Sequence, residues 1–329
     1  YNSANVSQET KDQIEQHWFP GVEGGTWKIQ LGPQFGIIEE DDILGHQYWH
    51  SFLTALRNHS PDGGLDSILI SNIDLSIPIL EDLLPAIAHL SDVTFSSAPI
   101  RKDGLLYLIN FMGENASWTK FQISMSKTDN ILDMEIAQCF SDVLKHHSCL
   151  RQVNFGCYSL GARPDILCVL LDGMKHVGKV SMWHLELTSQ GHHMANMLKK
   201  NPDLQHLKAG CNLFNDNDAA AFADALKYNT NLKLLALDSQ FRRLTSVGGK
   251  ALLKAVFDGS SLDAVFDSNH TCRVTYDNMD DMQENVNRLH DINLSRENII
   301  KYKLLMALGA FGGTEKIKIE LLKEVQEAV

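Results

Sequence analysis

Histidines, cysteines and carboxylates are the residues of this sequence whose types and spacing could do chemistry. Two pairs of adjacent histidines, His146-His147 and His192-His193, carry ring nitrogens that can ligate a metal ion. Neighbouring residues on a helix point about 100° apart, so neither pair can easily present both rings to one metal from the same helix. The spacing therefore favours histidines on helix surfaces, and we expect no metal site.

A cysteine nucleophile needs a base close to it in space, which His184 or His206 could supply to Cys157 or Cys211 from a neighbouring strand. The sequence lacks the H-E-x-x-H, G-x-x-x-x-G-K-[ST], G-x-G-x-x-G and G-x-S-x-G signatures of hydrolases and nucleotide-binding proteins. Its six cysteines include no C-x-x-C pair, which favours reduced thiols packed as small apolar residues. We therefore expect a protein that is not an enzyme and has no cofactor.

The elements that must position these side chains recur along the chain. The template is an apolar residue, two free positions, an apolar residue, one free position and a further apolar or small residue. Copies begin at Leu65, Leu90, Trp118, Leu150, Val177, Leu204, Leu232 and Leu262. Their intervals of 25, 28, 32, 27, 27, 28 and 30 residues lie close to the range of about 20 to 29 that is typical of leucine-rich repeats.

Each interval also contains apolar residues at helical spacing. Between Asp216 and Asn229, capping residues precede a stripe that includes Ala219 and Phe222. Similar stripes occupy residues 79–88, 105–112, 134–144, 166–174, 194–198 and 251–257. One strand and one helix cannot bury their own apolar faces, so neighbouring repeats must stack. The pattern predicts an α/β fold, a curved solenoid with a parallel concave sheet and convex helices.

The segment Asn212–Ala219, followed by Ala223–Leu232, resembles the leucine-rich repeat of the ribonuclease-inhibitor type, and the likeness covers about two thirds of the chain. In that family an asparagine at the ninth repeat position forms a ladder along the array, and Asn212 stands at this position. Other repeats hold Ile73, Ala98, Ser126, Tyr158, Leu185, Gln240 and His270 there. The resemblance therefore implies a degenerate array that lacks most of this ladder. Residues 244–258 and 268–272 also resemble a terminal repeat of leucine-rich families in microbial eukaryotes such as diatoms.

The repeats end on both sides in segments with a different pattern. We expect an N-terminal cap in residues 1–60, which includes a possible first strand at residues 27–31. Repeats should follow in residues 61–275, and a helical C-terminal cap in residues 276–329. The cap carries helical patterns at residues 279–289, 297–308 and 316–325. Because the chain begins at Tyr1 with no basic segment followed by an apolar one, we expect a fragment rather than a signal peptide.

Composition narrows the range of partners. The chain of 329 residues is 44% hydrophobic and 21% charged, which is typical of globular proteins. No apolar run approaches the roughly 18 residues of a membrane span, so we expect no membrane partner. The net charge of −12, and basic residues that do not alternate with aromatic ones, argue against nucleic acid. We expect a cytoplasmic protein, with the nucleus as the alternative.

The template also predicts which side chains point away from the core. Its free positions place one cation on each of five successive repeats, which makes the centre of the concave face mildly basic. Trp183 at a free position would expose a large apolar surface of the kind that is enriched at binding hot spots. The candidate partner-binding residues are Lys120, Gln122, Arg151, Asn154, Lys179, Ser181, Trp183, His206, Lys208 and Lys233.

Two functions follow from this surface. The first is a non-enzymatic scaffold that binds a protein segment of acidic or mixed charge on the concave face. The alternative is the regulator of an enzyme, such as a GTPase-activating or ribonuclease-inhibitor-like leucine-rich-repeat protein. A reactive arginine or asparagine in an edge loop would favour the alternative, and the sequence identifies none.

Overall fold

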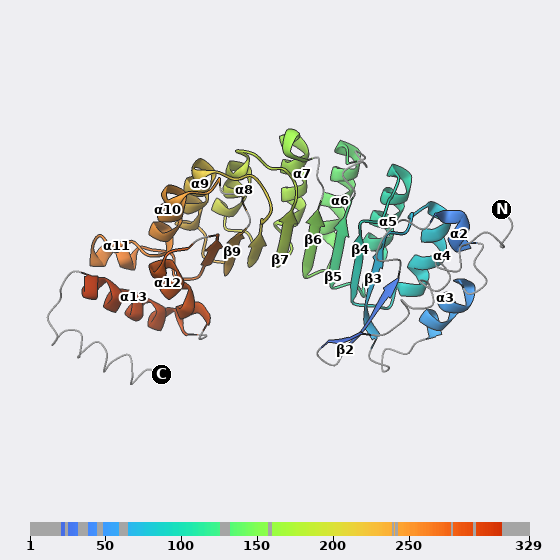
Figure 1. Cartoon of the computed structure of the whole chain (residues 1–329), viewed down its shortest axis with the longest axis horizontal. Coiled ribbons are helices and arrows are strands. Elements are labelled where there is room, and N and C mark those ends of the chain that lie inside the picture. The colour runs from blue at the N-terminus through green and yellow to red at the C-terminus, as the bar shows by residue number, and fades with distance from the viewer. Residues whose placement is uncertain are drawn as a thin grey trace. The chain divides into compact units, whose positions relative to one another are not determined.

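The computed structural model describes residues 21–23, 26–31, 39–44, 49–58, 65–125, 132–156, 160–238, 240, 243–277, 279–291 and 294–310. The chain forms two compact units. Unit 1 comprises residues 1–159 and 165–180, and unit 2 comprises residues 160–164 and 181–329. Figure 1 labels the elements of both units.

Unit 1 alternates strands with helices. Its elements are β1 (Gly21–Glu23), β2 (Thr26–Leu31), α2 (Glu40–Leu44), α3 (Trp49–Asn58), β3 (Leu65–Ser71), α4 (Ile77–Ile87), β4 (Asp92–Ser96), α5 (Lys102–Glu114), β5 (Lys120–Ser124), α6 (Met134–His146), β6 (Gln152–Gly156) and α7 (Pro164–Met174). β1 pairs with β2 antiparallel, and β2, β3, β4, β5 and β6 pair parallel in chain order. β7 (Lys179–Trp183) is divided between the units after Val180.

The register of unit 1 stacks equivalent repeat positions in rows. Phe95 on β4 has Ile70 of β3 and Ile123 of β5 as its neighbours, and Ile123 in turn has Phe155 of β6. All four side chains are buried. Because alternate residues of a strand point to opposite faces, these rows form the core while the residues between them form the other face.

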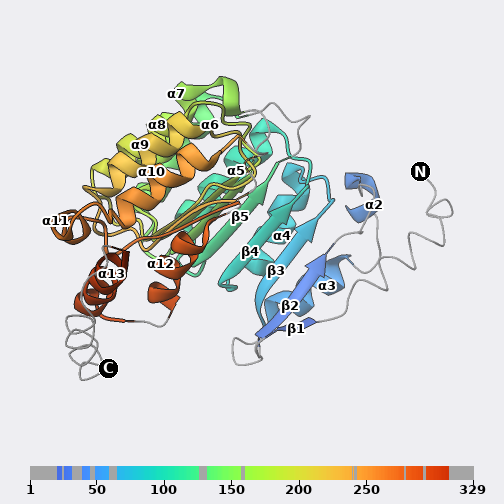
Figure 2. The same cartoon turned by 60° about the vertical axis from the view of Figure 1, so that its left-hand side comes forward.

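Unit 2 repeats the same alternation. Its elements after β7 are α8 (Gly191–Lys199), β8 (His206–Lys208), α9 (Asp216–Leu226), β9 (Leu234–Leu237), α10 (Ser246–Val256), α11 (Leu262–Phe266), β10 (Arg273–Tyr276), α12 (Asp281–Asp291) and α13 (Arg296–Ala310). β8, β9 and β10 pair parallel. Figure 2 shows α8, α9 and α10 as neighbouring helices along unit 2.

A ladder of side-chain amides ties the loops of unit 2 together. Asn212 is fully buried, donates to the carbonyl oxygens of Met182 and Ala209 at 3.0 and 3.1 Å, and accepts from the Leu185 N–H at 3.1 Å. Gln240 makes the equivalent bonds one repeat later. Its amide donates to Ala209 O at 2.9 Å and its oxygen accepts from the Phe214 N–H at 3.1 Å. The ladder therefore extends to Gln240, one rung further than the sequence predicted.

The C-terminal helices cover the last strand. Asn287 of α12 donates to Val274 O at 2.7 Å and accepts from Val274 N at 3.3 Å, so one side chain satisfies backbone groups of β10, which is the last described strand of the sheet. This covering of a sheet edge by a helix is what the sequence predicted for a C-terminal cap.

The structure confirms the α/β leucine-rich-repeat fold with a helical C-terminal cap. The predicted strands from Leu65 to Leu237 and the predicted helices within the described residues are present, and so is the strand at residues 27–31. The strand predicted at Leu262 is wrong, because this segment is the helix α11 and the strand that follows α10 in the sheet is β10. The helix predicted at residues 316–325 lies outside the described residues. No described helix is long and apolar enough to cross a membrane.

Candidate functional site

The outward-facing side chains of β4, β5 and β6 in unit 1 bond largely to one another. Lys120 pairs with Asp92 at 2.5 Å. The Asn154 amide donates to Gln122 Oε1 at 3.0 Å, and its own oxygen accepts from the amide of Gln152 at 3.2 Å. These groups would have to give up protein partners before they bound a ligand, which lowers the affinity they can supply.

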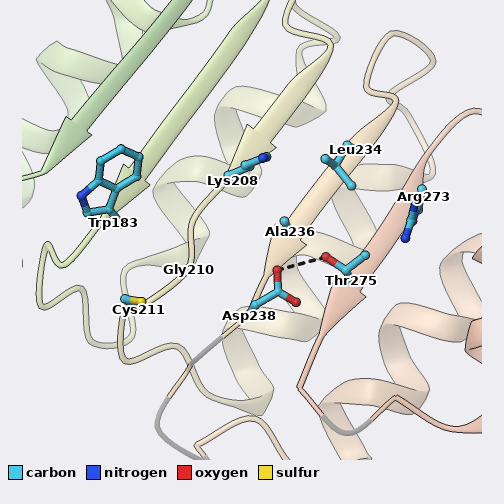
Figure 3. A pocket seen from close by; sticks show the side chains of 9 residues that line it. All are labelled: Trp183, Lys208, Gly210, Cys211, Leu234, Ala236, Asp238, Arg273 and Thr275. Atoms are coloured by element: carbon cyan, nitrogen blue, oxygen red, sulfur yellow. Dashed lines mark hydrogen bonds between the residues drawn. The ribbon is translucent and has the colours of Figure 1, made fainter. Parts of the chain in front are cut away.

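The outward face of the sheet in unit 2, which we call the strand face, carries a hollow. Its volume is ≈ 470 Å³, within the range of about 300 to 1,000 Å³ that is usual for ligand pockets. The residues that line it are Trp183, Lys208, Gly210, Cys211, Leu234, Ala236, Asp238, Arg273 and Thr275. They come from β7, β8, β9, β10 and the loops that follow them (Figure 3).

The strand register explains why the face is hollowed here. Ala236 of β9 lies between Lys208 of β8 and Thr275 of β10, its direct neighbours across the sheet. Leu234 has Arg273 as its neighbour on β10 in the preceding row. Because the side chain of alanine ends at Cβ, Ala236 is shorter than the Lys208 and Thr275 side chains on either side of it, and it lines the bottom of the hollow (Figure 3).

Backbone contacts hold the rim of the hollow. The Cys211 N–H donates to Asp238 O at 3.0 Å, and Cys211 itself has a φ of 53°. A Cβ added at Gly210 would lie 2.9 Å from the same carbonyl oxygen, so this position needs glycine for the close approach of the two loops. The Gln240 amide also donates to Asp238 O at 3.3 Å. The rim is therefore fixed by the same amide ladder that stabilises the fold.

The hollow combines apolar surface with charges of both signs. Lys208 is exposed, and within the described part of the chain its amine makes neither an ion pair nor a hydrogen bond. Arg273 lies on the far side of Leu234 from Lys208 (Figure 3). The Asp238 carboxylate accepts from the Thr275 hydroxyl at 3.2 Å. This arrangement is suited to binding a group that is partly apolar and partly charged.

The two pairs of adjacent histidines lie in different surroundings. His147 Nδ1 accepts from the N–H groups of Cys149 and Leu150 at 3.3 and 3.0 Å, so the ring serves the turn that leads to β6. The rings of His192 and His193 lie 3.9 Å apart, but the described residues contain no group of three His, Cys, Asp or Glu side chains that could hold a metal ion.

Cys211 lines the hollow in unit 2, while neither His184 nor His206 is among the lining residues. Cys157 lies outside the described residues. The pairing of a cysteine with a base from a neighbouring strand is therefore not part of this site.

Comparisons with known proteins add little to this geometry. No family model and no curated protein matches the chain. Among solved structures, an internalin (InlF) from Listeria monocytogenes str. 4b F2365 is similar over 69% of this chain and 71% of its own, with 14% sequence identity and a TM-score of 0.32.

Two of the ten predicted binding residues, Trp183 and Lys208, line the hollow. Trp183 is half-buried at the end of β7. Of the others in unit 2, Ser181 is buried, His206 is half-buried, and Lys233 is exposed one residue before β9. In unit 1, the predicted residues Lys120, Gln122 and Asn154 bond to neighbouring side chains, whereas Arg151 and Lys179 are exposed.

Sequence reasoning missed Arg273 and Thr275 because it placed the last strand at Leu262. A second repeated pattern would have located β10. Asn229 accepts from the N–H groups of Asn231 and Leu232, and Asn269 accepts in the same way from Thr271 and Cys272. This Asn-x-x-apolar pattern precedes both β9 and β10, and Asn115-Ala-Ser-Trp118 repeats it before β5.

Proposed function

We propose that this chain is a non-enzymatic protein-interaction module that binds a protein segment of acidic or mixed charge on its strand faces. The observation that carries this proposal is that three lysines on the strand side form no ion pair within the described residues. Several lysines on or next to the helices pair with carboxylates, as where Lys145 and Lys175 both pair with Asp172 at 2.7 and 2.6 Å.

Three lysines on the strand side have no such partner, in contrast to Lys120, which pairs with Asp92. Lys179 in unit 1 and Lys208 and Lys233 in unit 2 are exposed, and their amines make no ion pair within the described residues. In a chain of net charge −12, cations that intramolecular carboxylates leave unpaired can attract an acidic partner without first breaking an ion pair. Half-buried Trp183 adds an apolar surface of the kind found at binding hot spots.

We further propose that the repeats are of the ribonuclease-inhibitor type. The bonds of Asn212 and Gln240 support this, because they form consecutive rungs of a side-chain ladder at the expected repeat position. A cytoplasmic location, with the nucleus as the alternative, stays a prediction. So does the alternative role as the regulator of an enzyme.

Affinity capture from a lysate of the source cells, with quantitative mass spectrometry, tests the proposed function. Two variants, Trp183→Ala and Lys179→Glu, should each lose proteins that the wild-type chain captures. Lys250→Glu is the matched control, because Lys250 is an exposed lysine on α10 and carries the same change of charge. Retention of every captured protein by both variants would contradict the proposal, provided that all the chains melt at similar temperatures.

A further inference from the structure

The short helix α11 belongs to an insertion that the preceding repeat of unit 2 lacks. The Asn229 amide donates to Leu198 O near the end of α8, and one repeat later the Asn269 amide donates to Leu226 O at the end of α9, both at 2.7 Å. The two asparagines therefore hold equivalent positions. Asn229 follows the last residue of α9 by three positions, whereas Asn269 follows the last residue of α10 by thirteen. The longer connection contains α11, which packs beside α13 (Figure 1).

Contacts on one side of α11 and at its two ends hold it in place. Val265 is fully buried. The Ser261 hydroxyl caps the start of the helix by accepting from the Ala264 N–H at 3.0 Å. The Ser268 hydroxyl donates to Ala264 O at 2.8 Å and accepts from the Asp258 N–H at 2.9 Å, which fixes the turn at the other end. Little ordering of α11 is therefore needed when something binds to it.

The fixed helix exposes two large apolar side chains. Leu262 is 45% exposed and Phe266 is 63% exposed. Residues four apart are neighbours on the surface of a helix, so the two side chains form one apolar stripe. Water covers this stripe in the described chain, and its removal by a partner would be favourable.

Two aspartates lie beside the apolar stripe. Asp263 and Asp267 each follow a member of the apolar pair by one residue, so they form a second stripe about 100° further round the helix. Both are exposed, and their carboxylates form no ion pair and no hydrogen bond within the described residues. Lys254 pairs instead with Asp258 at 3.5 Å, and the exposed Arg296 at the start of α13 pairs with neither aspartate. Both carboxylates are therefore open to a cation from another molecule.

We infer that α11 binds a basic segment of a partner protein, in which a bulky apolar side chain covers Leu262 and Phe266 and an adjacent lysine or arginine pairs with Asp263 or Asp267. Charge selects this occupant, because an acidic segment would meet two like charges on the helix. An anionic lipid surface would meet the same repulsion. The inference goes beyond the proposed function, since it concerns a different surface and a partner of the opposite charge.

The experiment is a subtractive selection of phage-displayed random dodecapeptides on the immobilised full chain. The library is first depleted on the double variant Phe266→Ser, Asp267→Lys, which removes peptides that bind elsewhere on the molecule. The peptides that remain should contain Lys or Arg next to Leu, Ile, Val, Met or an aromatic residue. A fluorescently labelled synthetic copy of the most enriched peptide is titrated by anisotropy. Replacing its Lys and Arg residues with Gln should weaken binding by about fivefold or more.

Single variants of the protein test the two stripes separately. Phe266→Ser should weaken the labelled peptide by about tenfold or more through lost apolar contact, and Asp267→Lys by about fivefold or more through charge. The matched controls are Val247→Ser, at an exposed valine of α10, and Asp203→Lys, at an exposed aspartate outside α11. Both should leave the affinity within about twofold.

Circular dichroism melting of each variant separates lost binding from lost folding. All four positions are exposed, so the variants should melt as the wild-type chain does. Leu262→Ser removes the other member of the apolar pair and replaces Phe266→Ser if that variant melts early.

Three outcomes would overturn the inference. These are a library with no binder left after depletion, remaining peptides without Lys or Arg, and an affinity that either Phe266→Ser or Asp267→Lys leaves unchanged. None of these results depends on the strand faces, so the proposed function is tested separately by its own variants, Trp183→Ala and Lys179→Glu.

Discussion

Lys303 of the C-terminal cap takes the place that Asn269 has one repeat earlier. The Asn269 amide donates to the backbone carbonyls of Leu226 and Asn229, both at 2.7 Å. The Lys303 amine donates to the corresponding carbonyls of Val256, at the end of α10, and of Asn269, at 2.6 and 2.9 Å. A lysine of α13 thus ends the row of asparagines that connects successive repeats, and it does so at a fully buried position.

Replacing Lys303 with methionine should lower the free energy of unfolding by about 1–3 kcal/mol, because methionine fills the space but leaves two buried carbonyl oxygens without their donor. Urea unfolding followed by circular dichroism at pH 8 measures the change. Lys301→Met, two residues away on the same helix and half-buried, is the control and should change stability by less than about 0.5 kcal/mol. Equal stability of the two variants would show that the amine does not stabilise the cap.

Unfolding should also depend on pH through the same lysine. Burial lowers the pKa of Lys303 from 10.5 to about 7, so above pH 7 the unfolded chain binds a proton that the folded chain does not. The free energy of unfolding therefore rises with pH, by at most about 1.4 kcal/mol per unit. Burial raises the pKa of the nearby Cys272 thiol from 9.0 to about 12, and that shift opposes the rise above pH 9.

The rise is best measured between pH 7 and pH 9, from urea midpoints of the wild-type chain and of Lys303→Met. The groups that face the amine are His270, whose Nδ1 lies 3.3 Å away, and the buried Cys272. Burial and the charge of Lys303 lower the pKa of His270 to about 4, so His270 does not titrate in this window in the folded state. The wild-type chain should gain stability relative to the variant as pH rises. Parallel curves would contradict the prediction.

The repeat fold could be read from the sequence because its period, its apolar template and its helical stripes all indicate the same elements. The one misplaced strand shows what the template lacks. Residues 262–267 satisfy the apolar pattern, but Ser261 caps a helix there by accepting from the Ala264 N–H at 3.0 Å. β10 instead follows Asn269, a polar residue outside the apolar template whose side-chain oxygen accepts from the Cys272 N–H at 2.8 Å.

The candidate site was harder to predict because it depends on neighbours across strands. The strand register places Ala236 between the longer side chains of Lys208 and Thr275. Thr275 belongs to β10, the strand that the sequence analysis placed wrongly. The sequence also did not show which lysines form ion pairs. Lys120 and Lys208 occupy free positions of the same template, yet a carboxylate of the preceding strand pairs with the first, while no described carboxylate pairs with the second.

In unit 1, Gly173 of α7 should not tolerate a methyl group. A Cβ there would lie 2.6 Å from Cα of Ser141 on α6, so one of the two helices would have to move. Gly173→Ala should lower the free energy of unfolding by about 1–3 kcal/mol, as expected for overpacking. Gly113→Ala on α5 is the control. Its Cβ would meet a side-chain methyl group of Val143 at 3.0 Å, and alanine favours helix, so stability should stay the same or rise slightly. Urea midpoints in which Gly173→Ala is no worse than Gly113→Ala would contradict the close packing.

Gln240 should behave as a structural rung although the ribonuclease-inhibitor type of repeat, which we propose for this chain, has asparagine at this position. In Gln240→Leu the N–H of Phe214 loses its acceptor in a buried setting, whereas Ala209 O keeps a donor in Asn212. We expect a loss of about 1–3 kcal/mol for this one orphaned donor, against less than about 0.5 kcal/mol for Gln205→Leu at an exposed glutamine of the same unit. Hydrogen exchange adds a local readout, because the Phe214 amide should exchange faster in Gln240→Leu than in the control. If its exchange rate and the urea midpoint both match the wild-type chain, Gln240 is not a rung, and the ladder ends at Asn212.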